Sequence, residues 1–168
     1  TETLATDAMP FQFQFDVSAS GQPKLVVLDD VSGYTYHTTT SWMSLHQEIR
    51  TFNDFGTYPA TSIDGNGDLH MVYSHPTIEK MYYSTETASG WSNSEILSNA
   101  NLSSAPSLWF DGADMHILYR DSSLDRLERV TKSGSTWSTA TELGSGEAVG
   151  TEHVALQVPS GPTLVATT

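Results

Sequence analysis

Cysteine is absent from the 168-residue sequence, which excludes a disulfide framework, a thiolate metal site and a cysteine nucleophile. Basic side chains are scarce, with 7 Lys and Arg against 20 Asp and Glu. Because phosphate recognition needs clustered positive charge, we expect no binding to nucleic acid. No apolar run approaches the roughly 18 residues of a membrane span, so we also expect no membrane insertion.

The N-terminus shows neither a basic region nor an apolar signal core, and the sequence begins at Thr1 without a methionine. We interpret this start as the result of removing a leader or a larger precursor. The acidic residues are spread along the chain, which gives a broadly negative surface. These features favour a secreted protein.

Two segments of the chain are copies of one pattern. Residues 59–91 align with residues 106–137 at an offset of 46 or 47 positions, and the alignment matches His70 with His116. The same step backwards gives a more diverged first copy, and the step forwards gives half of a fourth copy. A fixed period of this length is the sign of a repeat architecture. The chain therefore contains about three and a half copies of a unit of about 46 residues.

Each copy consists of short β-type runs separated by turn residues. FQFQFDV at 11–17 alternates with period two and is followed by a Gly/Pro turn and the β-branched run KLVVL. No stretch of a dozen residues has a helical stripe. Four short strands per repeat predict an all-β protein, a β-propeller made of four-stranded blades. A β-sandwich is the alternative, but it would not require a regular period.

The repeat divides the predicted domain, a propeller half-domain over 1–168. The predicted blades are 9–52, 53–99 and 100–146, with a half-blade at 147–168 and an outer strand at 1–8 that completes a half-blade. Three and a half blades do not close a ring, and exposed half-blade edges promote aggregation. We therefore predict a homodimer that closes a ring of seven blades. A four-bladed monomer and a fragment of a longer propeller are the alternatives.

Two segments resemble the repeats of the sialidase-like or BNR-like (Asp-box) propeller superfamily. They are SIDGNGDLHMVY at 62–73 and WFDGADMHILY at 109–119, each followed by a Gly-Trp or Thr-Trp pair. Of the Asp-box pattern Ser-x-Asp-x-Gly-x-Thr-Trp, the third copy keeps Gly134, Thr136 and Trp137, and the aspartate is missing. The resemblance implies a propeller fold, and lectin-like propellers are similar at this level.

The resemblance says less about activity. Sialidases of that superfamily use an arginine cluster for the substrate carboxylate, a tyrosine with an acidic partner, and an aspartate acid/base. This chain has only four arginines, which are Arg50, Arg120, Arg126 and Arg129. It also lacks the family's Arg-Ile-Pro motif. No pair of carboxylates stands out by spacing. We assign no catalytic residue and favour a protein that is not an enzyme.

One register of the repeat carries the ligand-binding candidates. Asp16, Ser62, Trp109 and Gln157 occupy equivalent positions on the first strand of each copy, each one residue before an apolar position. A tryptophan in this otherwise polar register is either a local packing exception or an exposed aromatic platform on which a sugar ring can stack. We name these four residues as candidate ligand contacts.

The turn DGNGD is a weak candidate for a calcium site. Asp64, Asn66 and Asp68 offer alternate oxygen ligands, but the bidentate Glu of an EF-hand is missing. A plain hairpin is the alternative, because the sister turn DGAD drops a residue and still fits the repeat. The equivalent His70 and His116 lie in separate blades, so we expect packing or surface roles for them.

These observations lead to a function prediction with two alternatives. We predict a secreted, lectin-like propeller that recognises a glycan or another extracellular ligand without catalysis and needs no cofactor. The acidic surface and the few arginines favour neutral sugars. The alternatives are a glycoside-active enzyme of the sialidase-like type and a structural or protein-interaction module.

Overall fold

The computed structural model describes most of the repeat region. The described residues are 12–29, 33–38, 46–50, 57–75, 79–98, 100, 102, 104–145, 153–157 and 163–167. Within these ranges the chain forms strands and turns and has no helix, so the predicted all-β class is confirmed. It follows that no helix in the same ranges could cross a membrane.

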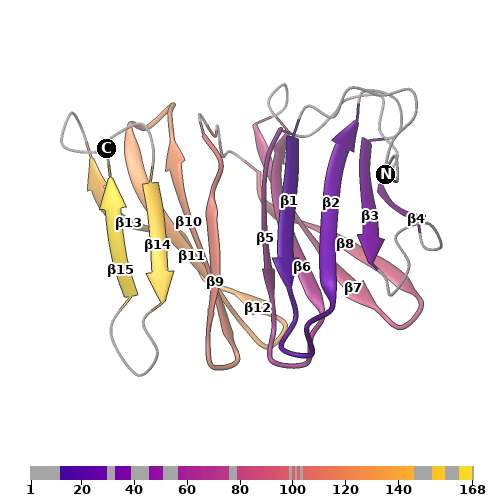
Figure 1. Cartoon of the computed structure of the whole chain (residues 1–168). Coiled ribbons are helices and arrows are strands. Elements are labelled where there is room, and N and C mark those ends of the chain that lie inside the picture. The colour runs from indigo at the N-terminus through magenta and orange to yellow at the C-terminus, as the bar shows by residue number, and fades with distance from the viewer. Residues whose placement is uncertain are drawn as a thin grey trace.

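The strands form four antiparallel sheets that follow one another along the chain (Figure 1). The first sheet contains β1 (Gln12–Val17), β2 (Pro23–Asp29), β3 (Gly33–Thr38) and β4 (His46–Arg50). The second contains β5 (Thr57–Ile63), β6 (Leu69–His75), β7 (Lys80–Thr87) and β8 (Gly90–Leu97). The third contains β9 (Ser107–Asp111), β10 (Asp114–Asp121) and β11 (Arg126–Ser133), and both β12 (Thr136–Trp137) and β13 (Thr141–Ser145) pair with β11. The fourth contains β14 (His153–Gln157) and β15 (Thr163–Thr167).

Strand order equals chain order in the first two sheets, as expected for hairpins joined by short turns. Each of the predicted blade ranges 9–52, 53–99 and 100–146 contains one of the first three sheets, and the range 147–168 contains the fourth, two-stranded sheet. The predicted outer strand at 1–8 lies outside the described residues.

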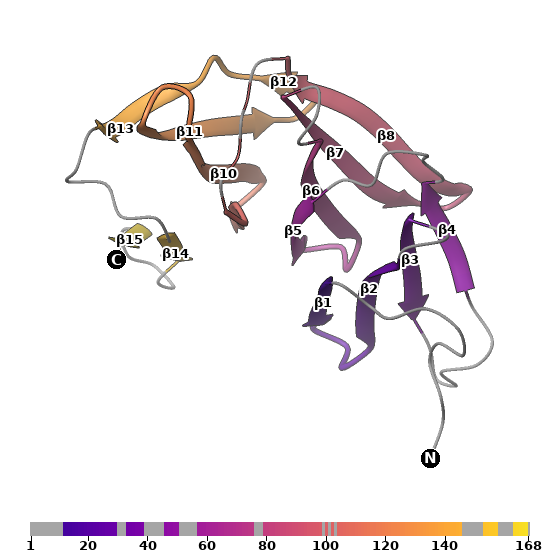
Figure 2. The same ribbon diagram turned by 90° about the horizontal axis from the view of Figure 1, so that it is seen from above.

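Seen from above, the sheets follow one another around an arc (Figure 2). Their first strands lie on the inside of the arc, where β1 contacts β5, β5 contacts β9 and β9 contacts β14. This radial stacking is the arrangement expected of propeller blades. The first and the fourth sheets stand at the two ends of the arc. The number of blades in a closed ring stays a prediction.

Apolar clusters fill the spaces between consecutive sheets. Val26 of the first sheet packs with Leu69, Met71 and Tyr73 of the second. The cluster between the second and third sheets contains Val72, Met81, Tyr83, Ala100, Leu102, Met115, Ile117, Tyr119 and Val130. Met71 and Val72 are consecutive, fully buried and belong to different clusters. Since successive side chains of a strand point to opposite faces, the second sheet is buried on both sides.

The repeat preserves the position of a buried tyrosine but changes its partner. Tyr73 and Tyr119 are equivalent, and each packs in the cluster that its sheet shares with the preceding sheet. Tyr73 stacks on Tyr82, with ring centroids 5.6 Å apart. The Tyr119 hydroxyl instead donates to Glu128 Oε2 at 2.6 Å, and burial raises the pKa of Tyr119. A hydrogen bond thus satisfies a polar atom that burial would otherwise penalise.

The packing between sheets predicts where the chain is sensitive to truncation. Ile117 is fully buried, whereas Leu143 is 46% exposed. Ile117→Ala should lower the free energy of unfolding by about 2–5 kcal/mol through lost burial and a residual cavity. Leu143→Ala should change it by less than about 0.5 kcal/mol. Urea denaturation measures both, and equal effects of the two substitutions would contradict the sheet-to-sheet core.

Candidate functional site

The four predicted ligand contacts all lie near the ends of the first strands of their sheets. Their partners on the second strand are Lys24 for Asp16, His70 for Ser62, His116 for Trp109 and Thr163 for Gln157. Directly paired residues place their side chains on one face of the sheet. The partners show that this face is turned to the next sheet, because Lys24 contacts the turn after β5 and His70 contacts Phe110 of β9.

Lys24 joins the first sheet to the second. Its ammonium group donates to the carbonyl oxygen of Gly67 at 2.5 Å and pairs with Glu86 Oε2 at the same distance. The Lys24 side chain is only 5% exposed, so its charge needs this partner. Glu86 also accepts the backbone N–H of Leu69 at 3.2 Å. Lys24, the cross-strand partner of the predicted ligand contact Asp16, therefore makes a structural contact between two sheets.

His70 has a similar place between the second and third sheets. Its Nδ1 lies 2.6 Å from the hydroxyl of Tyr83, its Nε2 lies 3.5 Å from Asp64 Oδ2, and its ring meets the edge of Phe110. Burial lowers the pKa of His70, and the nearby Asp64 carboxylate only partly offsets this effect. In the neutral imidazole with its proton on Nε2, Nδ1 accepts a hydrogen bond from the Tyr83 hydroxyl, while Nε2 is buried beside the Asp64 carboxylate without a hydrogen bond.

Asp64 closes the turn between β5 and β6. Its Oδ1 accepts the backbone N–H groups of Asn66 and Asp68, each at 2.9 Å. Partial burial by itself raises the pKa of Asp64, but these N–H groups and His70 outweigh it and hold the pKa below its usual value. This is the geometry of the hairpin alternative. Among the described residues, no group of three or more His, Asp or Glu side chains could hold a metal ion, and calcium binding stays a prediction.

Trp109 is not an exposed platform in this chain. Its side chain is 7% exposed, its ring stacks on His116 with centroids 5.2 Å apart, and it packs with Leu118 and Leu127. The reason is its direction, since it faces the fourth sheet, whose strand β14 contacts β9. The alternative of a local packing exception describes Trp109. Asp16 and Ser62 are partly exposed, and the side chain of Gln157 lies outside the described residues.

The two ends of the sheets differ in which residues adopt a left-handed backbone conformation. At the hairpin end, which holds the turns after β1, β5, β7, β9 and β11, the left-handed positions are glycines: Gly21, Gly67, Gly90, Gly112 and Gly134. At the start end, where β5 begins and where β6 and β10 turn back, they are Tyr58, Glu79 and Asp125, with φ of 56°, 51° and 50°. A residue with a Cβ pays roughly 1–2 kcal/mol for this conformation. At the start end, three residues with side chains therefore adopt a strained backbone conformation.

Tyr58 is the least expected of the three. Glu79 and Asp125 occupy the same position in two copies of the repeat, so their conformation belongs to the turn itself. The repeat equivalent of Tyr58 is Ala105, which does not share the left-handed conformation. A β-bulge interrupts the pairing of β5 and β6 between Thr57 and Ala60. Because bulges redirect a side chain, the strained backbone sets the direction of the Tyr58 ring.

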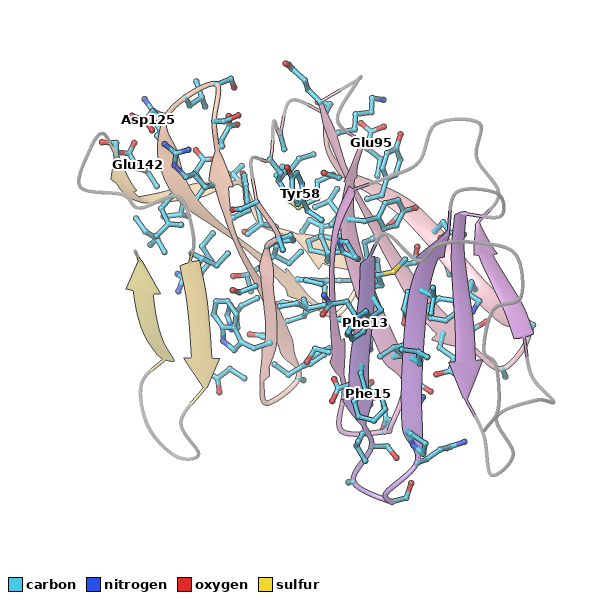
Figure 3. The ribbon with its side chains drawn as sticks, turned by 45° about the horizontal axis from the view of Figure 1, so that its top comes forward. Phe13, Phe15, Tyr58, Glu95, Asp125 and Glu142 are labelled. Carbon is cyan, nitrogen blue, oxygen red and sulfur yellow. The ribbon has the colours of Figure 1, made fainter. Side chains whose placement is uncertain are left out.

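The Tyr58 side chain is half-buried and rests against the apolar cluster between the second and third sheets. Figure 3 shows Tyr58 at the start end, the same end as Glu95 and Asp125. No sequence signal pointed to Tyr58, since neither Gly nor Asn marks its backbone conformation.

Carboxylates at the start end are held by basic side chains. Lys80 pairs with Glu95 at 2.6 Å, and the equivalent Arg126 pairs with Glu142 at 3.4 Å. Arg120 pairs with Asp125. The repeat therefore preserves an ion pair between the third strand of a sheet and its outer strand.

Solved structures with this fold include carbohydrate-active enzymes. A protein of unknown function from Dyadobacter fermentans aligns with a TM-score of 0.68 at 13% identity, over 91% of this chain and 56% of that chain. An exo-β-1,3-galactanase from Clostridium thermocellum aligns with a TM-score of 0.62 at 12% identity, over 94% and 41%. A GH43 β-1,3-galactosidase aligns with a TM-score of 0.54 at 10% identity, over 82% and 32%. No family model and no curated protein sequence matches the chain.

At these identities the similarity shows the fold alone. GH43 glycosidases have a five-bladed β-propeller, so a propeller-type fold is supported. These three structures support a propeller-type fold in general and not the sialidase-like family to which the degenerate Asp-box motif was compared. The chain spans between 32% and 56% of the length of these three structures.

The burial of Trp109 predicts that its truncation affects stability. An exposed platform would lose ligand binding at unchanged stability, whereas the buried ring should make Trp109→Ala cost about 3–5 kcal/mol of unfolding free energy. Trp109→Phe, which keeps an aromatic ring, should cost less. Urea denaturation of both variants tests this, and an Ala variant as stable as the wild type would restore the platform interpretation.

The histidines between sheets predict a dependence of stability on pH. Burial lowers the pKa of His70 and of His116 below 6.5, so the folded chain binds fewer protons than the unfolded chain as the pH falls. The contribution of these histidines to the free energy of unfolding should therefore be fully present above about pH 6.5 and be lost as the pH falls below that value. Asp64 adds its own loss only at more acid pH, because its pKa lies below 3.8.

The matched experiment compares the melting temperature at about pH 7.5 and 5 for the wild type and for His70→Gln/His116→Gln. The double variant should show a smaller decrease than the wild type. A decrease of equal size in both proteins would contradict the assignment to these two histidines.

Proposed function

We propose that the chain is a secreted, non-catalytic propeller module that recognises a neutral glycan at the start end, with Tyr58 as its main contact. The observation that carries the proposal is the backbone of Tyr58, which is left-handed and lies at a β-bulge. Strain of this kind persists where the surrounding structure over-determines it, and it concentrates at ligand sites. A partly exposed aromatic ring fixed in direction suits the apolar face of a sugar.

Carbohydrate is the ligand class that the structural neighbours support. Two of them, which share the fold, are named as a β-1,3-galactanase and a β-1,3-galactosidase. The scarcity of basic side chains favours an uncharged sugar over a sialylated or sulfated one. Oligosaccharides of β-1,3-linked galactose are therefore the first probes.

Recognition is favoured over hydrolysis by the state of the acidic side chains. Glycoside hydrolysis needs two carboxyl groups that reach the scissile bond, one of them available as a proton donor. At the start end, Glu95, Asp125 and Glu142 are held by basic partners, and Glu128 accepts the hydroxyl of buried Tyr119. Each of these four carboxylates therefore has a partner within the fold, which supports recognition over hydrolysis.

A glycoside-active enzyme is the second candidate, favoured by the same two neighbours. A reducing-sugar assay on β-1,3-galactan separates the candidates. Release of sugar by the wild type, lost on substitution of an acidic side chain at the start end, would replace the binding proposal.

Substitution of Tyr58 tests the binding site. Tyr58→Asn keeps a residue that tolerates the left-handed region and removes the ring, so it should retain the fold while weakening glycan binding by about tenfold or more. Tyr58→Phe keeps the ring and should weaken binding less. Asn66→Ala, in the turn at the hairpin end, is the matched control and should bind as the wild type does.

Binding is measured by titration calorimetry with galacto-oligosaccharides after a glycan array has identified the best probe. Folding is monitored in parallel by circular dichroism. Equal affinity of wild type and Tyr58→Asn would overturn the role of Tyr58. An array without any bound glycan would overturn carbohydrate recognition and favour a protein-interaction module.

A further inference from the structure

One face of the first sheet is apolar and exposed. Phe13, Phe15 and Val17 alternate along β1 and are 66%, 54% and 48% exposed. Alternation places the three side chains on one side of the strand, opposite the side of Asp16 and its partner Lys24, which faces the second sheet. Figure 3 shows Phe13 and Phe15 side by side along β1. A contiguous apolar stripe of this kind marks an interaction surface.

The repeat indicates what covers such a face. The positions equivalent to Val17 are Ile63 and Phe110, and both are packed against the preceding sheet. Ile63 lies against the cluster that contains Val26, and Phe110 meets the ring of His70. The stripe on β1 is therefore the repeat's own sheet-to-sheet surface, and a sheet of the same repeat is the partner that fits it.

The other end of the arc offers a sheet of that type. The fourth sheet has two described strands, β14 and β15, where each of the other sheets has at least four. Among the described residues, one chain thus carries an exposed sheet face at one end of the arc and a two-stranded sheet at the other, and Figure 2 shows the two ends apart. Two chains arranged head to tail would bring each end against its complement.

The contact surface on β1 carries no charge, although the chain as a whole is acidic. The formal net charge of −13 makes two copies repel each other at long range. The stripe itself carries no ionisable group, and its neighbours on β2 in the same register, Leu25 and Val27, are apolar as well. Repulsion should therefore be weakest at this face, and added salt should strengthen the association.

We propose that Phe13, Phe15 and Val17 of one copy pack against the fourth sheet of a second copy, so that two chains close one ring. The contact continues the packing already present between the first, second and third sheets. It does not rest on glycan recognition, because the stripe lies on a sheet face and Tyr58 lies at the start end.

Sedimentation velocity and light scattering of the 168-residue chain test the proposal. We expect twice the mass of the 18.3 kDa chain at micromolar concentration. Phe13→Gln/Phe15→Gln should raise the dimer dissociation constant by about tenfold or more. Leu143→Gln, at a side chain of similar exposure in the third sheet, is the matched control and should leave it unchanged. Circular dichroism confirms folding of each variant.

The absence of cysteine allows a direct test of the head-to-tail orientation. In a face-to-face dimer, two copies of Val17→Cys would approach each other and form a disulfide under mild oxidation, which requires Cα atoms within about 7 Å. The head-to-tail arrangement predicts no disulfide-linked dimer. A monomeric wild type, an assembly larger than a dimer, an unchanged constant in the double glutamine variant or a disulfide-linked Val17→Cys dimer would each overturn the proposal.

Discussion

Burial on both faces is the constraint on which the rest of the molecule depends. A four-stranded sheet of this size has two apolar sides, and a single sheet leaves at least one of them in water. The chain meets this constraint by placing sheets side by side around an axis, so that consecutive residues such as Met71 and Val72 are buried against different neighbours. Among the described residues, the constraint is not satisfied on β1, where Phe13, Phe15 and Val17 are exposed.

Polar contacts add specificity to this apolar stacking. Equivalent positions on the second strands carry Lys24, His70 and His116, and the contacts that each makes are different. Lys24 needs Glu86 and a turn carbonyl, and His70 needs Asp64 and Tyr83. Apolar burial supplies the attraction between sheets. The partners of Lys24 lie on the neighbouring sheet and add a specific contact there, whereas Asp64 and Tyr83 lie on the sheet of His70 itself.

Much of the fold was predictable from the sequence, because the period and the alternation of side chains are local signals. They predicted the all-β class and short strands separated by turns, such as the hairpin turn that joins β5 and β6. Burial of Trp109 was not predictable, since exposure depends on a neighbouring sheet and not on the residue's own strand. The contact of Lys24 with Glu86 joins residues 62 positions apart, and the conformation of Tyr58 depends on a bulge that no turn residue announces.

The unlike contacts at one repeated position also fix the sequence of the sheets around the axis. If the first and second repeats exchanged places, the lysine ammonium would face Phe110 and would lose Glu86, which would leave a desolvated charge without that counterion. The first and second repeats are therefore not interchangeable. Duplication or shuffling of one unit would have to change both sides of a junction together, which limits how this lineage of repeats can still grow.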